Sequence, residues 1–165
     1  MNPIFPADLL EEATRLIADL RGRALKLATA ESCTGGLVAG LLTEVAGASD
    51  VLERGFVTYS NAAKIGMLGV DPELLRRHGA VSAEVARAMA EGALRCSAAD
   101  VAVAVTGIAG PSGGTAEKPV GLVHLAAAMS GAATLERERR LGGQTRAAIR
   151  LASVREALAL VRRLL

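Results

Sequence analysis

Three polar segments of this sequence combine residue types that can carry out chemistry. The first reads ESCTGG, residues 31–36, and places Ser32, Cys33 and Thr34 side by side before two glycines. Each of these side chains can act as a nucleophile once its proton is removed. A hydroxyl ahead of a helix can also serve only as a cap for the free N–H groups of the first turn. The segment therefore predicts a nucleophile or a helix start, and a cap alone does not explain three adjacent candidates.

The second segment, YSNAAK, contains groups that could accept the proton of such a nucleophile. It holds Tyr59, the one tyrosine of the chain, and Lys64 five residues later. Either side chain can take a serine proton if burial or a nearby positive charge lowers its pKa from the usual value of about 10. Taken alone, Tyr59 is typical of a packing residue and Lys64 of a solvated one. In combination with Ser32 they indicate a Ser–Lys–Tyr arrangement.

The two histidines favour this arrangement over a histidine-based triad. His78 follows an arginine-rich helical stretch, and His124 lies within an apolar strand, where we expect a core residue. Neither histidine adjoins a polar segment, and Cys33 and Cys96 lack the spacing of a metal site. A histidine triad and a metal centre are therefore both less favoured.

The third segment, TGIAGPSGG at residues 106–114, has the composition of a ligand-binding loop. Thr106 and Ser112 contribute hydroxyl groups, and glycines let the backbone approach a ligand closely. The segment matches neither the GK[ST] phosphate loop nor the GxGxxG dinucleotide fingerprint, and the alternative is a flexible connection between strands. We interpret it as a candidate phosphate cradle, with glycines at Gly107, Gly110, Gly113 and Gly114.

Each polar segment follows or ends a stretch that is typical of a strand, and the first of these stretches, ALKLATA, reads as a buried one. The strand-like stretches are ALKLATA, ERGFVTYS, DVAVAVT and VGLVHLAAAM, and ATLERERRL suits a charged edge strand. An amphipathic helix is predicted from Leu9 to near Gly22, and GGLVAGLLTEVAG reads as a helix that closes at Gly47.

Further helices are predicted between the later strands. One runs over residues 61–68, one opens at Pro72, and one is capped by Ser82. The last helix carries an apolar seam, which we expect to pack in the core, although a second copy of the chain could also cover it. The seam consists of Leu151, Val154, Leu158, Val161 and Leu165.

This alternation of helices and strands predicts an α/β fold: a three-layer α/β/α sandwich around a mixed, mostly parallel central sheet. Because no linker, repeat or low-complexity run divides the chain, we expect residues 1–165 to form a single domain. Ligands of such sheets bind at the carboxyl ends of the strands. The three polar segments should therefore converge on one site.

Composition narrows the class of protein. The formal net charge is only +2 and aromatic residues make up 2% of the chain, which disfavours a nucleic-acid-binding protein. No apolar run reaches the length of a membrane span, and the stretch MNPIFPADLLEE lacks the basic start and apolar core of a secretion signal. We expect a cytoplasmic protein that binds a small molecule, without nucleic-acid or membrane partners; a homo-oligomer is compatible with the sequence.

The sequence resembles the C-terminal domain of the competence/damage-inducible protein CinA, whose stand-alone members are nicotinamide-nucleotide amidohydrolases. The resemblance covers the chain from about Leu9 to its end. It rests on AESCTGG, GASDVLERGFVTYSNAAK, GAVSAEVARAMAEGA and TGIAGPSGGTAEKPVGLV, in this order. It implies hydrolysis of the carboxamide of nicotinamide mononucleotide to nicotinate mononucleotide and ammonia, without a metal or another cofactor.

The resemblance also implies a role for individual residues. Ser32 would be the nucleophile, and Lys64 and Tyr59 would transfer its proton and later serve the leaving ammonia. The phosphate would meet backbone N–H groups and a basic side chain. The implied substrate-binding residues are Glu31, Thr34, Gly35, Gly36, Asn61, Thr106, Gly107, Gly110, Pro111, Gly113, Gly114 and Arg146.

One stretch departs from the family pattern. A GDR-like motif is usual before the last helix, whereas this chain reads GGQTR, with Gln144 and Thr145 where an acid is common. Arg146 and Arg150 keep the usual spacing of two arginines. The departure motivates an alternative hypothesis, in which the domain is a catalytically weak nucleotide-binding or regulatory module that uses the same pocket.

Overall fold

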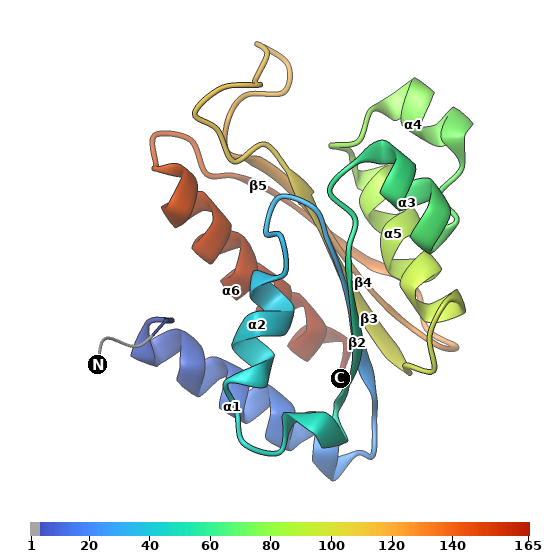
Figure 1. Cartoon of the computed structure of the whole chain (residues 1–165), viewed down its shortest axis with the longest axis vertical. Coiled ribbons are helices and arrows are strands. Elements are labelled where there is room, and N and C mark those ends of the chain that lie inside the picture. Colours follow the sequence, from blue (N-terminus) through green and yellow to red (C-terminus); the bar gives the residue numbers. More distant parts are fainter. Residues whose placement is uncertain (1–3) are drawn as a thin grey trace.

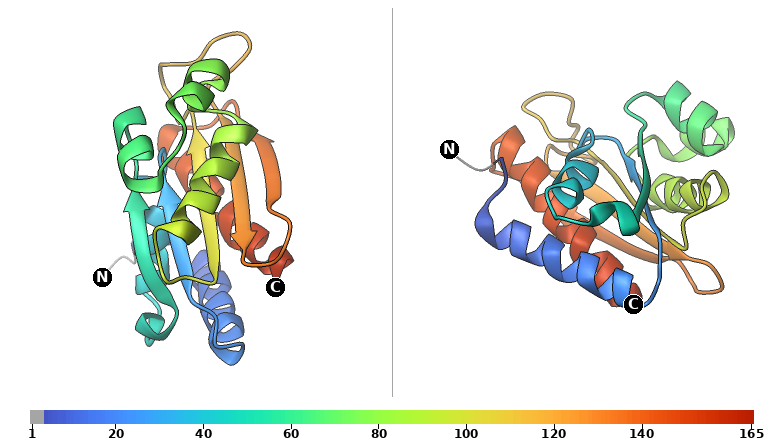
Figure 2. Two further views of the ribbon diagram at one scale, coloured as in Figure 1. Left: turned by 90° about the vertical axis from the view of Figure 1, so that its right-hand side faces the viewer. Right: turned by 60° about the horizontal axis from the view of Figure 1, so that its bottom comes forward.

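The computed structural model describes residues 4–165, and its centre is a mixed sheet. Within this range the sheet has five strands: β1 (Leu27–Glu31), β2 (Leu52–Val57), β3 (Val101–Gly107), β4 (Leu122–Met129) and β5 (Leu135–Arg140). They lie in the order β2-β1-β3-β4-β5, visible in the left view of Figure 2. β1 pairs in parallel with β2 and β3, whereas β4 is antiparallel to β3 and β5.

Helices cover both faces of this sheet (Figure 1). One face packs against α1 (Ala7–Gly22), α2 (Leu37–Thr43) and α6 (Arg146–Leu164). On the other side lie α3 (Asn61–Leu68), α4 (Pro72–His78) and α5 (Ala83–Arg95), and a 3-10 turn at Ala48–Asp50 precedes β2. The predicted three-layer α/β/α sandwich with a mixed sheet is confirmed, and ATLERERRL supplies the predicted edge strand, β5.

The two faces of the sheet differ in the size of their side chains. Because successive strand residues point to opposite faces, Val103 and Val105 of β3 pack toward α6, whereas Ala102 and Ala104 face α5. The same alternation gives the α5 face a set of small residues from three strands: Ala28, Ala30, Ala102, Ala104, Ala126 and Ala128. These methyl groups leave room for α5 to lie close to the sheet.

Local signals fix where most helices begin. The Ser82 hydroxyl accepts a hydrogen bond from the Val85 N–H, which confirms the predicted cap, and Pro72 opens α4 as expected. The helix predicted over residues 35–47 is shorter than expected at both ends, since α2 begins only at Leu37 and ends at Thr43. Gly36 has a φ of +97°, which is outside the helical region and is the reason for the late start.

The two ends of the chain bear on the remaining sequence predictions. Residues 1–3, part of the N-terminal stretch considered above as a secretion signal, lie outside the described residues. The seam of α6 packs into the core, where Val154, Leu158 and Val161 are fully buried and Leu151 and Leu165 are partly buried. Within residues 4–165, no helix has both the length and the apolar character required to span a bilayer.

Candidate active site

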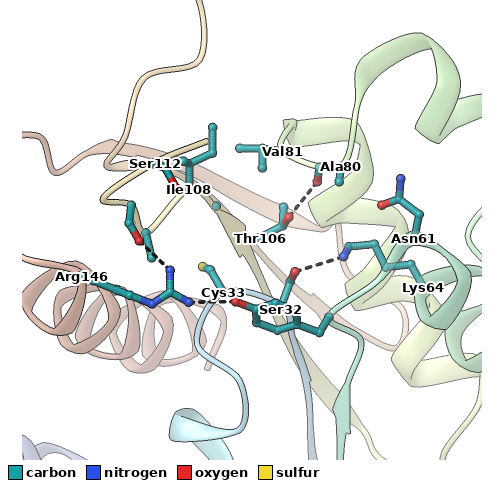
Figure 3. Close-up of a pocket in the computed structure, with 14 residues that line it drawn as sticks. Ser32, Cys33, Asn61, Lys64, Ala80, Val81, Thr106, Ile108, Ser112 and Arg146 are labelled. Carbon is teal, nitrogen blue, oxygen red and sulfur yellow. Dashed lines mark hydrogen bonds between the residues drawn. The ribbon is translucent and has the colours of Figure 1, made fainter. Parts of the chain in front are cut away.

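A pocket of about 260 Å³ lies where the three polar segments meet at the carboxyl ends of the parallel strands (Figure 3). This is the position predicted from the alternation of strands and helices. Its walls come from the ends of β1 and β3, the start of α3, the α4–α5 turn, the glycine loop and the start of α6. The lining residues are Ser32, Cys33, Tyr59, Asn61, Lys64, Ala80, Val81, Thr106, Gly107, Ile108, Ala109, Gly110, Ser112 and Arg146.

Ser32 and Lys64 are in direct contact in this pocket. The Lys64 Nζ donates hydrogen bonds to the Ser32 Oγ at 3.1 Å and to the Thr58 carbonyl oxygen at 2.9 Å. Local structure explains the approach, because Ser60 caps α3 and places Lys64 in the first turn of that helix, facing the end of β1. The predicted pairing of a serine with a lysine is therefore present in the structure.

Burial changes the proton affinity of both groups beside Ser32. The Lys64 side chain is only 1% exposed, and this burial lowers its pKa below the usual lysine value because the charged form loses hydration. Burial raises the pKa of the Cys33 thiol to about 11. Lys64 is thereby suited to accept a proton, whereas the neighbouring thiol stays protonated and unreactive.

Tyr59 faces the same pocket but has a different partner. Its phenol oxygen accepts a hydrogen bond from the Arg146 Nη2 at 2.8 Å, and the Arg146 Nη1 donates to the Gly110 carbonyl oxygen at 2.7 Å. The contact with Arg146 occupies a lone pair of the phenol and leaves the phenol hydrogen available to a ligand. Tyr59 therefore belongs to the arginine side of the pocket. Ser32 is bonded instead to Lys64 (Figure 3).

The strand ends place further polar side chains beside Ser32 on the α5 face. Glu31 is in register with Val57 and Val105, so Ser32, one residue on, lies between Thr58 and Thr106. The Thr106 hydroxyl donates to the Ala80 carbonyl oxygen at 2.7 Å and joins the end of β3 to the α4–α5 turn. The alanine rows of β1 and β3 on this face thus end in hydroxyl groups, Ser32 and Thr106, at the pocket.

Some residues implied by the resemblance do not line the pocket. The buried Glu31 carboxylate accepts hydrogen bonds from the N–H groups of Gly36, Val38 and Ala39 at 2.9 to 3.1 Å, so it caps the start of α2. The substrate contact that the resemblance implies for Glu31 stays a prediction, whereas the hydrogen bonds of its carboxylate are those of a helix cap. The other residues outside the lining are Thr34, Gly35, Gly36, Pro111, Gly113 and Gly114.

Other residues of the site were missed by the sequence analysis. Ala80 and Val81 form part of the wall although neither has a reactive side chain. Their only signal was the stretch GAVSAEVARAMAEGA, which contributes to the family resemblance. His124 is buried as predicted, and the pairing of β3 with β4 places it in register with Thr106, a neighbour that its position in the sequence did not indicate.

The unusual GGQTR stretch forms an ordinary helix start. The Thr145 hydroxyl accepts a hydrogen bond from the Ala148 N–H at 3.2 Å, as the acid of a GDR-like motif would do in this position. Arg146 follows as the first residue of α6 and reaches the pocket. The departure from the family pattern therefore leaves the cap and the arginine in place.

The arrangement fits acyl-transfer chemistry. A serine hydroxyl is hydrogen-bonded to an amine of lowered pKa, and a phenol and a guanidinium face the same cavity. These are the roles of nucleophile, base and charge-stabilising donors. Among residues 4–165, no group of three His, Cys, Asp or Glu side chains is arranged to hold a metal ion.

Comparison with known sequences identifies relatives over nearly the whole chain. The CinA C-terminal domain family matches residues 10–165. The chain is 54% identical over 143 residues to a CinA-like protein of Geobacter sp. (strain M21), covering 87% of this chain and 34% of that protein. It is 63% identical over 117 residues to a putative competence-damage inducible protein of Symbiobacterium thermophilum, covering 71% of this chain and 27% of the relative. The chain thus spans about a third or less of the length of these curated relatives.

Solved structures show the same similarity in three dimensions. The crystal structure of the competence/damage inducible protein CihA from Agrobacterium tumefaciens is 56% identical, with a TM-score of 0.97 and 99% of each chain covered. A CinA superfamily protein from Escherichia coli is 35% identical, with a TM-score of 0.90, covering 99% of this chain and 96% of that chain.

Proposed function

Because this chain belongs to the CinA C-terminal domain family, we propose that it hydrolyses the carboxamide of nicotinamide mononucleotide to nicotinate mononucleotide and ammonia. The observation that carries the proposal is the 3.1 Å contact between the Ser32 Oγ and the Nζ of a fully buried lysine, Lys64. This pair supplies an activated nucleophile for an amide without requiring a histidine. The choice of nicotinamide mononucleotide comes from the family resemblance alone.

In the first half of the reaction the serine becomes acylated. Neutral Lys64 takes the Ser32 proton as the Oγ forms a bond to the carboxamide carbon. The protonated lysine then gives this proton to the amide nitrogen, the C–N bond breaks, and ammonia leaves. The products of this half are an ester on Ser32 and one molecule of ammonia, so atoms and charge balance.

In the second half the ester is hydrolysed. Lys64 takes a proton from water as the water oxygen bonds to the ester carbon, and it returns a proton to the Ser32 oxygen when the ester bond breaks. The acid product ionises, and Ser32 and Lys64 return to their starting states. The same lysine thus acts as base and then as acid in each half-reaction.

Tyr59 and Arg146 have a separate role in this scheme. The Tyr59 phenol accepts from Arg146 and keeps its own hydrogen for the pocket, so it can donate to the carbonyl oxygen as negative charge develops there. This assigns Lys64 as the direct base and Tyr59 as a donor. The assignment refines the initial scheme, in which either group could take the serine proton.

The test is ammonia release from nicotinamide mononucleotide by the purified protein with a chelator present. Ser32→Ala should abolish release while the protein stays folded, and Cys33→Ala should retain it because the buried thiol is protonated. Cys96→Ala, which changes the exposed cysteine, is the matched control for Cys33→Ala. Activity that survives in Ser32→Ala but disappears in Cys33→Ala would refute the serine assignment. Tight binding of the mononucleotide without ammonia release would instead support the binding-module hypothesis.

A further inference from the structure

The turn that carries Ser32 is held from two sides by side chains of opposite charge. It leaves β1 at Ser32, whose N–H donates to the Val105 carbonyl oxygen at 2.9 Å, and it enters α2 after Gly36. On one side, the Glu31 carboxylate binds three N–H groups at the start of α2. On the other side, the carbonyl oxygens of the turn point toward α6.

Arg150 of α6 binds these carbonyl oxygens. Its Nε donates to the Cys33 oxygen at 3.1 Å and its Nη2 donates to the Thr34 oxygen at 2.9 Å. The rigid, planar guanidinium can bind two acceptors at once, which a lysine ammonium cannot do in the same fixed geometry. Directly after these two carbonyl groups, Gly35 has a φ of +60°, a backbone conformation that favours glycine, and the Arg150 Nη2 lies in van der Waals range of this residue.

The contacts of Arg150 differ from those of the arginine one helical turn earlier. Arg146 lines the pocket and binds Tyr59, whereas Arg150 is absent from the lining and binds only backbone oxygens of the turn among its hydrogen-bond partners in residues 4–165. Residues four apart lie on the same side of a helix. One side of α6 therefore contacts both the open wall of the pocket and the segment that carries the nucleophile.

We infer that Arg150 is a positioning residue, which holds the Cys33 and Thr34 peptides and thereby keeps the Ser32 Oγ within reach of Lys64. The inference rests on the proposed function, because it assigns Arg150 a part in the same reaction. Serine has a short side chain with one rotatable bond to its oxygen, so a shift of the turn moves the Oγ by a similar distance. A displacement of about 1 Å at a reacting group can cost about 10²-fold in rate.

The experiment compares Arg150→Met and Arg150→Lys with Arg162→Met, a control on the same helix that loses only an exposed contact with Asp19. Two rates are measured for each protein: ammonia release from nicotinamide mononucleotide, and labelling of Ser32 by a fluorophosphonate followed by intact mass. We expect Arg150→Met to lower kcat and the labelling rate by about 10²-fold with KM changed less than threefold. Arg150→Lys should recover only part of the loss, and Arg162→Met should match the unchanged protein.

A second variant separates positioning from a general loss of folding. Arg150→Ala opens space for free guanidinium, and millimolar guanidinium should restore part of the labelling rate if the two carbonyl contacts matter. Labelling and kcat within threefold of the unchanged protein in Arg150→Met would overturn the inference, as would a failure of guanidinium to restore any rate in a folded Arg150→Ala. If the unchanged protein releases no ammonia but Ser32 is labelled in an Arg150-dependent way, the proposed substrate fails and the positioning role stands.

Discussion

The two sides of the pocket differ in how deeply their side chains are buried and in the contacts that hold these side chains in place. On one side, Lys64 is fully buried, and its Nζ contacts one hydroxyl and one carbonyl oxygen. On the other side, Tyr59 is 60% exposed and Arg146 is exposed, and each restrains the other through a hydrogen bond. Burial alone lowers the pKa of Lys64, with no need for a neighbouring charge. The exposed side chains of Tyr59 and Arg146 are instead held in place by their hydrogen bond to each other. The buried side therefore suits proton transfer, and the open side suits binding and charge stabilisation.

Removing the amine on the buried side should have the largest effect. Lys64→Met keeps the length and apolar stem of the side chain but has no proton acceptor, so we expect kcat to fall by about 10³- to 10⁴-fold, at the upper end of what general-base catalysis contributes. Steady-state ammonia release measures the loss. Lys64→Arg is the matched variant: it keeps a cation that cannot lose its proton, and it should be equally inactive. Substantial activity in either variant would mean that another group takes the Ser32 proton.

On the open side, a smaller loss is expected from Tyr59→Phe. This change removes the phenol hydrogen that we assign to the developing oxyanion, which should lower kcat by about 10²-fold with little change in folding. A double-mutant cycle with Arg146→Met tests whether the two groups act together, as their 2.8 Å contact indicates. If the losses of the two single variants, expressed as free energies of activation, simply add in the double variant, Tyr59 and Arg146 work independently. A loss in Tyr59→Phe as large as that in Lys64→Met would remove the distinction between the two sides.

The pH dependence should also distinguish the sides. Because burial lowers the pKa of Lys64, its neutral form appears at a lower pH than the usual lysine pKa of about 10.4, and kcat/KM should rise with pH through that lowered value. Tyr59→Phe should leave this rise in place, since it changes no group on the buried side. A pH profile that instead changes shape in Tyr59→Phe would identify the phenol as the titrating base.

The smallest effect is expected in stability. Between the folded pKa of Lys64 and about 10.4, the unfolded chain binds more protons than the folded chain, so the free energy of unfolding should rise with pH. The free energy of unfolding gains about 1.4 kcal/mol for each tenfold difference in the proton affinity of Lys64 between the unfolded and the folded chain. Below the folded pKa the penalty for burying the ammonium is fully present. Urea unfolding at several pH values should show this rise in the free energy of unfolding. If Lys64→Met shows the same rise, a group other than Lys64 causes it.

The layers of the fold and the central part of the site could be predicted from sequence because both depend on local patterns. Apolar strands followed by polar segments placed Ser32, Lys64 and Thr106 at one edge of the sheet. The role of Glu31 could not be predicted, because every residue of β1 is buried and no alternation shows which face each one occupies. Arg150 was noted only for its spacing, since its contacts depend on where α6 crosses the end of the sheet. The distances between elements that are remote in sequence do not follow from local patterns and could be obtained only from the structure.

The small alanine side chains on the α5 face set the distance between α5 and the sheet, and this distance affects the position of the pocket wall. Thr106 stands two residues beyond Ala104 on the same strand face, and its hydroxyl holds Ala80 in the pocket wall. A bulkier side chain at one of the buried alanines would push α5 outward and, through that connection, move the wall relative to Ser32. The position of this wall therefore depends on residues that are not themselves part of the pocket lining.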